Sequence, residues 1–241
     1  MKIAAYSLVL IVSFLLSARA DLTIVQKVER AGSATNMTIK LKGDKVRIEA
    51  SPQVTTIIDG KTGEVTNLMN DQKTVVRISA DKVKAVANMI QKPNAKKEGA
   101  GKAKLTPTGL KETVNGYETE QYTYDGPDFK ATYWIASNYP DGAAILAQLQ
   151  SVRSEFWNAA NPGVPDYRDF PGLPIRTRMT TKQAEATKLR GSAAEITSTI
   201  VSVNQNPISD DEFTVPSDFK ETKLPDIFDK KNTAPSVSPS P

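Results

Sequence analysis

The stretch that decides the fold is residues 37–48, which read Met-Thr-Ile-Lys-Leu-Lys-Gly-Asp-Lys-Val-Arg-Ile. Apolar and polar residues alternate on both sides of the Gly43-Asp44 pair. Alternation with period 2 is typical of a strand that has one buried and one solvated face, as in an antiparallel sheet. A Gly-Asp pair between two such runs indicates a two-residue hairpin turn. The stretch therefore predicts two neighbouring antiparallel strands.

The same alternation extends in both directions along the chain. Runs with this pattern occupy residues 22–30, 54–58, 64–69, 74–79, 109–114, 117–124, 129–136, 175–181 and 194–203. The Asn115-Gly116 pair separates two of these runs, and Asn-Gly is a strong hairpin signal. We therefore expect about eleven strands, joined largely in meander order.

Two amphipathic helices are predicted between the strand runs. One covers residues 81–90 and the other residues 141–158, each with apolar residues spaced three and four apart. That spacing places the apolar residues on one side of a helix. Because many antiparallel strands tend to curl, the helices have a natural place inside the curve. We expect an α+β fold, namely a single strongly curved antiparallel sheet (a half-barrel) with helices packed on its concave face.

The first twenty residues have the three parts of a secretory signal peptide. Lys2 precedes an apolar run that ends at Leu16, and Ala18-Arg19-Ala20 forms an A-x-A cleavage site. We expect cleavage after Ala20 and export to the periplasm or the extracellular medium, with no stable membrane anchor left. Losing Lys2 and Arg19 lowers the formal net charge from +4 to +2, which gives no reason to expect nucleic acid as a partner.

The rest of the chain is expected to form one half-barrel domain at residues 21–223. Inside it, residues 92–104 are rich in Lys, Ala and Gly, which indicates a flexible basic linker. Residues 224–241 are rich in Pro, Ser and Lys, and we expect a disordered tail there.

The composition excludes several kinds of chemistry. The chain contains no His and no Cys, so Ser-His-Asp and Cys-His catalytic sites and zinc sites of the Cys/His type cannot be built. We expect no cofactor and no metal site. The sequence does not decide whether the protein is an enzyme, but it favours a non-enzymatic protein.

Three stretches carry a resemblance to a known family: residues 37–48, residues 57–64 and residues 213–219. The chain resembles a family of uncharacterised bacterial exported proteins, classed as a domain of unknown function. At the level of fold it is similar to the periplasmic lipoprotein-carrier superfamily. That resemblance implies an open half-barrel whose concavity holds a lipid or acyl chain, and it implies no catalytic residue.

An apolar concavity is therefore the first functional hypothesis. Its predicted lining is Met37, Ile39, Val46, Ile48, Tyr133, Ile135, Leu149 and Trp157. The alternative is that the helices complete a filled core, because apolar stripes usually indicate packing. The protein would then be an interaction module for another periplasmic or cell-envelope protein.

A carboxylate-dependent hydrolase is the third hypothesis. Its candidate residues are Asp166 and Asp169 in a Pro-rich loop, and the Asp210-Asp211-Glu212 cluster. Paired carboxylates are the one route to general acid–base catalysis left in this chain. The sequence fixes no distance between them, and turn formation or solvated surface charge accounts for both groups.

Overall fold

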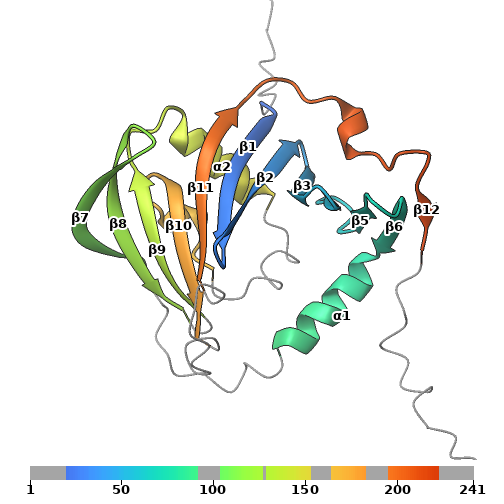
Figure 1. Ribbon diagram of the computed structural model, residues 1–241, viewed down its shortest axis with the longest axis horizontal. Coiled ribbons are helices and arrows are strands. Elements are labelled where there is room, and N and C mark those ends of the chain that lie inside the picture. The colour runs from blue at the N-terminus through green and yellow to red at the C-terminus, as the bar shows by residue number, and fades with distance from the viewer. Residues whose placement is uncertain (1–19, 92–103, 127–128, 153–163, 183–194, 223–241) are drawn as a thin grey trace, which may run out of the picture.

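The computed structural model describes residues 20–91, 104–126, 129–152, 164–182 and 195–222. These residues form one open sheet in the strand order β12-β6-β5-β4-β3-β2-β1-β11-β10-β9-β8-β7 (Figure 1). The strands are β1 (Leu22–Arg30), β2 (Ser33–Lys42), β3 (Lys45–Ser51), β4 (Val54–Asp59), β5 (Val65–Met69), β6 (Thr74–Ile78), β7 (Thr106–Val114), β8 (Tyr117–Asp125), β9 (Phe129–Ala136), β10 (Leu173–Thr181), β11 (Glu195–Asn204) and β12 (Lys220–Glu221).

The sheet consists of two antiparallel meanders that meet in its middle. β1–β6 form one meander and β7–β11 the other, and β1 pairs antiparallel with β11 where they join. The large antiparallel sheet is confirmed. About eleven strands were expected and the sheet has twelve. The additional strand is β12, a two-residue strand that pairs parallel to β6. A strand this short has too little alternation to be recognised in a sequence.

Both predicted hairpins are present. Lys42 pairs with Lys45 across Gly43-Asp44, and Val114 pairs with Tyr117 across Asn115-Gly116. Asn115 and Gly116 have φ angles of 50° and 84°. A turn with two left-handed residues matches the right-handed twist of the strands that it joins.

An apolar row crosses the first meander on one face of the sheet. Each member is the direct cross-strand partner of the next: Leu22, Leu41, Val46, Ile58, Val65 and Ile78. All are buried except Ile78, which is half-buried. We call this side the helix-bearing face, because both helices bury residues against it.

Helix α1 (Ala80–Gln91) buries Val83 in a cluster with Val46, Ile58 and Val65. Helix α2 (Gly142–Ser151) buries Ile145 and Leu146 in a larger cluster that includes Leu22, Ile24 and Leu41. α2 ends earlier than the predicted residue 158, because Val152 already forms its C-cap. Residues 153–163 lie outside the described part of the chain.

Part of the opposite face, over β2–β6, is covered by the C-terminal segment, residues 205–221, which we call the strap. It contains the short 3-10 helix η4 (Asp210–Phe213) and ends in β12. Phe213 is buried against Ile57, Leu68 and Val75. The strap was not predicted, since its role depends on contacts with strands far away in the sequence.

No helix within the described residues is long and apolar enough to span a bilayer. Most of the expected linker at residues 92–104 and of the expected signal peptide at residues 1–20, and all of the expected tail at residues 224–241, lie outside the described part of the chain.

Candidate functional site

The predicted lining residues lie on the helix-bearing face wherever the structure describes them. Val46, Tyr133 and Ile135 are buried. Met37, Ile39, Ile48 and Leu149 are half-buried. Trp157 falls outside the described residues.

These side chains belong to two adjoining apolar clusters. Val46 and Ile48 lie with Val83 of α1, while Tyr133 and Ile135 lie with Ile145 of α2. Ile39 and Val152 contact both clusters. Met37 belongs to neither of these clusters. The sheet and the two helices thus bring most of the predicted lining into one continuous apolar region.

Five half-buried side chains pack against these clusters: Ile39 and Val152 contact both, Ile48 and Ile78 contact only the cluster of Val83, and Leu149 contacts only the cluster of Ile145. We call these five residues the seam. Half-buried apolar side chains retain water-exposed surface that an apolar molecule could cover. The seam is therefore the candidate site for an apolar ligand on the helix-bearing face.

Phe170 was missed by the sequence analysis. It follows the 3-10 helix η2 (Tyr167–Asp169) and packs edge-on against Tyr133, with ring centroids 5.0 Å apart and planes at 80°. An edge-to-face arrangement is favourable because the positive ring edge meets the negative ring face. The Pro-rich loop therefore contributes Phe170 to the core that contains Tyr133.

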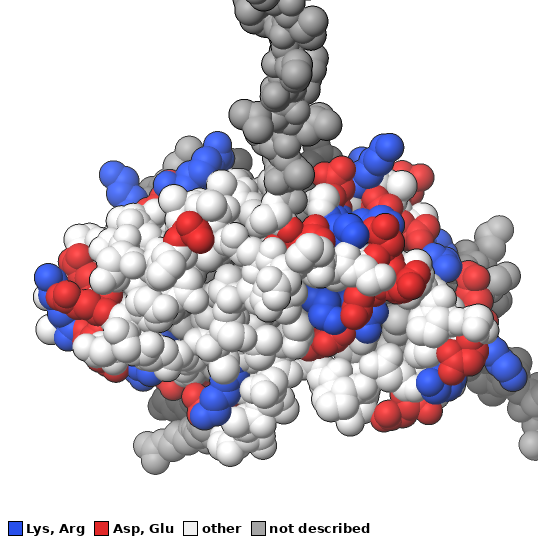
Figure 2. All heavy atoms as spheres, turned by 90° about the horizontal axis from the view of Figure 1, so that it is seen from above, with Lys and Arg blue, Asp and Glu red and all other residues white. Residues whose placement is uncertain are grey.

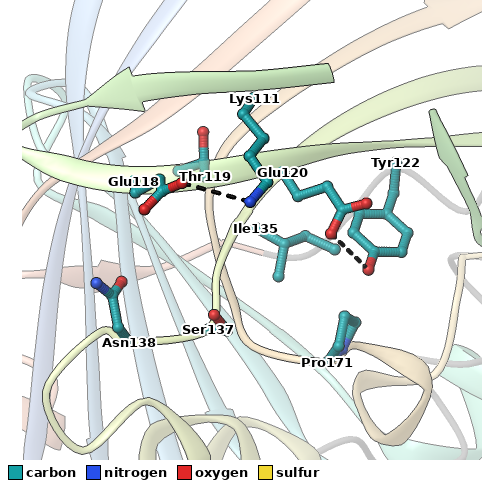
Figure 3. Close-up of a pocket in the computed structure, with 9 residues that line it drawn as sticks. All are labelled: Lys111, Glu118, Thr119, Glu120, Tyr122, Ile135, Ser137, Asn138 and Pro171. Carbon is teal, nitrogen blue, oxygen red and sulfur yellow. Dashed lines mark hydrogen bonds and ion pairs between the residues drawn. The ribbon is translucent and has the colours of Figure 1, made fainter. Parts of the chain in front are cut away.

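A separate pocket of about 440 Å³ lies at the other end of the sheet (Figure 3). One side is formed by residues of β7 and β8, and the other by Ser137, Asn138 and Pro171. Ile135 lies between the two sides and is the one predicted lining residue that reaches this pocket. Glu120 and Tyr122 are the cross-strand partners of Ile135 and Tyr133, so they share a sheet face with them.

The pocket carries charged side chains beside apolar ones. Lys111 Nζ lies 3.5 Å from Glu118 Oε1, and the Tyr122 hydroxyl donates to Glu120 Oε2 at 3.4 Å. Burial raises the pKa of Tyr122, and the charge of Glu120 and its hydrogen bond raise it further. Tyr122 therefore stays protonated at neutral pH and serves as a hydrogen-bond donor.

Three of the five carboxylates proposed for hydrolysis, Asp166, Asp210 and Glu212, have structural roles. Asp166 accepts the backbone N–H of Arg168 at 2.9 Å as the N-cap of η2, and it pairs with the Arg168 guanidinium at 2.7 Å. Asp210 pairs with Lys42 at 3.0 Å, and this hydrogen bond and charge lower the pKa of Asp210. A general acid needs a raised pKa, so the shift of Asp210 is in the wrong direction for that role.

Glu212 joins a charged cluster that fastens the strap to the sheet. It pairs with Lys40 at 2.9 Å, and its carbonyl accepts from Arg47 Nη1 at 2.8 Å. Glu49 pairs with Arg47 in the same cluster at 2.8 Å. Burial alone would raise the pKa of Glu49, but the hydrogen bonds and charges of Arg47 and Lys40 together lower it. Acidic and basic side chains intermingle on the side of the molecule seen in Figure 2.

Most of the chain matches the model of one protein family, and this match shows the family to which the chain belongs. A family model covers residues 21–219, and the chain is a member of the family described as a domain of unknown function (DUF4412). This agrees with the expected membership of an uncharacterised family. Comparison with curated proteins gives no match.

Several solved structures share a distant likeness with the chain. Two structures of PNGF-II, in space groups P21 and C2, are each 13% identical, with TM-scores of 0.39 and 0.38, and 85% and 87% of this chain is covered. The chain spans 32% of each PNGF-II chain. A DUF1329 family protein from Desulfovibrio piger ATCC 29098 is 9% identical, with a TM-score of 0.30 and coverage of 83% of this chain and 91% of that one.

Proposed function

We propose that this is an exported, non-enzymatic protein that binds a lipid or another apolar ligand along the seam. The helix-bearing face is, in this proposal, the concave face of the sheet. The ligand lies between α1, α2 and strands β2 and β3, and it is recognised by shape and burial rather than by reaction.

The observation that carries the proposal is the half-burial of Ile39 and Val152 between two buried clusters. Val46 and Val83 are buried on one side, and Leu41 and Ile145 on the other. Ile39 and Val152, which touch both clusters, remain partly exposed. Covering such apolar surface stabilises a complex by about 25 cal/mol for each Å² removed from water.

Export after cleavage behind Ala20 is part of the proposal. It rests on the n-region, the apolar run and the A-x-A site of the sequence. Sequencing the N-terminus of the protein recovered from the periplasm or the medium tests it. An intact N-terminus in the cell envelope would contradict cleavage.

Ligand binding is tested on protein purified from an exporting host without detergent. Solvent extraction and mass spectrometry should recover about one apolar molecule per chain, and a fluorescent fatty acid should bind saturably to the stripped protein. Ile48→Trp should weaken that binding about tenfold or more, because the larger side chain fills the seam.

Val201→Trp is the matched control, since Val201 lies on β11 and its side chain is 57% exposed. It should leave fatty-acid binding unchanged. The proposal fails if the wild type carries no stoichiometric lipid and binds no fatty acid saturably, or if both variants bind as the wild type does.

A protein-interaction module is the second candidate. β7 is a terminal strand of the sheet, and its residues are exposed from Thr106 to Thr113. Leu110 on this strand is 59% exposed. A terminal strand can pair with an extended segment of a partner. Crosslinking in the native envelope through a photoreactive residue at position 110 should capture one defined protein if this candidate is correct.

A further inference from the structure

The pocket between β8 and the loop after β9 combines an apolar floor with an excess of negative charge. Ile135 is buried, and Pro171 and the Tyr122 ring complete the apolar surface. The lining contains two carboxylates, Glu118 and Glu120, but only one cationic side chain, Lys111. Ser137 and Asn138 face them from the other side (Figure 3).

The two carboxylates differ in their partners. Glu118 has an ion pair with Lys111 at 3.5 Å. Among the described residues, Glu120 has no cationic partner within 4 Å, and its carboxylate accepts a hydrogen bond from the Tyr122 hydroxyl. Glu120 is also the more buried of the two, since it is half-buried whereas Glu118 is exposed. A half-buried carboxylate without a cation attracts one more strongly than a paired, exposed carboxylate does.

The loop side of the pocket is held in place by a close backbone contact. A Cβ at Gly172 would lie 2.4 Å from the carbonyl oxygen of Ala136 and 2.6 Å from the Cα of Ser137. The backbone before β10 therefore packs directly on the end of β9, which only glycine allows. This contact fixes Pro171 and Ser137 opposite Glu120, so the pocket exists before any ligand arrives.

We propose that this pocket binds a small organic cation, an ammonium group carried on a short apolar body. The ammonium group pairs with Glu120 and lies close to the Tyr122 ring, which adds a cation–π attraction. The apolar body covers Pro171, which is exposed, beside the buried Ile135. Anions are disfavoured by the two carboxylates, and a neutral ligand leaves the charge of Glu120 uncompensated. This site is separate from the seam, so the proposal of cation binding does not depend on the proposal of lipid binding.

The test is isothermal titration calorimetry of the full chain with benzylammonium chloride and with benzyl alcohol, its neutral counterpart. We expect benzylammonium to bind saturably with one molecule per protein chain. The dissociation constant of benzyl alcohol should be at least about tenfold higher. Glu120→Gln keeps the size of the side chain but removes its charge, and should weaken benzylammonium binding by about tenfold. Lys111→Met should strengthen it, because a competing cation is removed.

Glu29→Gln is the control for charge alone, since Glu29 lies on β1 and forms an exposed ion pair with Lys27 at 2.8 Å. It should bind benzylammonium as the wild type does. Circular dichroism establishes that each variant is folded. The proposal is overturned if folded wild-type protein does not bind benzylammonium saturably, if benzyl alcohol binds equally well, or if Glu120→Gln and Glu29→Gln have the same effect.

Discussion

Leu41 and Val46 are direct cross-strand partners in the β2–β3 hairpin, and they join the core beneath α2 to the core beneath α1. Leu41 is fully buried and belongs to the cluster of Ile145, whereas Val46 belongs to the cluster of Val83. The β2–β3 hairpin therefore contributes a buried side chain to the core beneath each helix.

Leu41→Ala should lower the free energy of unfolding by about 2–5 kcal/mol, because it removes buried methyl groups and leaves a cavity. Urea unfolding monitored by circular dichroism measures the loss. Val201→Ala on β11 is the control and should change stability by less than about 0.5 kcal/mol, since Val201 is exposed. Equal losses in the two variants would show that Leu41 is not a core residue.

Phe213→Ala should release the strap from the sheet, because Phe213 is the buried anchor between Ile57, Leu68 and Val75. The backbone amides of Lys220 and Thr222 donate to the carbonyls of Lys73 and Val75, both at 2.8 Å. Hydrogen exchange should show that these two amides lose protection while amides in β1 and β2 keep theirs.

Asp218→Asn is the control for the strap. It removes an exposed ion pair with Lys73 at 3.0 Å, which contributes little to stability, so the amides of Lys220 and Thr222 should remain protected. A uniform loss of protection throughout the sheet in Phe213→Ala would instead mean that the strap and sheet unfold as one unit.

Glu49 should make stability depend on pH. Its folded pKa lies below the ordinary value of 4.5, so its ionised form stabilises the fold above that value, and the contribution is lost as the pH falls through the folded pKa. The difference in unfolding free energy between the wild type and Glu49→Gln should therefore be full at pH 7 and vanish well below pH 4.5. A difference that stays constant over this range would contradict the coupling to Arg47 and Lys40.

Glu112→Ala should disturb Trp134, which is 4% exposed. The Trp134 indole N–H donates to Glu112 Oε2 at 2.8 Å, and Arg176 pairs with the other oxygen at 2.9 Å. Losing the acceptor leaves a buried donor unpaired and should cost about 1–3 kcal/mol. NMR should show faster exchange of the indole proton.

Glu195→Ala is the matching control for Glu112→Ala. Glu195 forms a half-exposed ion pair with Arg178 at 3.6 Å, so its removal should cost less than about 1 kcal/mol. Unchanged exchange of the Trp134 indole proton in Glu112→Ala would exclude the proposed hydrogen bond.

The strand pattern was predictable from the sequence because it depends on neighbours two residues apart. Alternation around Ile39 and Val46 and the turn at Asn115-Gly116 are local signals, and the structure follows them. The strap, β12 and the place of Phe170 depend on partners far away along the chain, so no local pattern reports them. The pocket at Glu120 was not predicted for the same reason, since its two sides come from β8 and the segment before β10.

The pairing of β1 with β11 has a consequence for how the protein reaches its folded state. Gln26 and Ser198 form a hydrogen bond across 172 positions of sequence, so the middle of the sheet can assemble only after β11 has been synthesised. Contacts of such long range slow folding and leave strand edges unprotected in the meantime. In a newly made chain, β1 should therefore lack its β11 partner until that strand has been synthesised, and this delay would suit the proposed export of an unfolded chain.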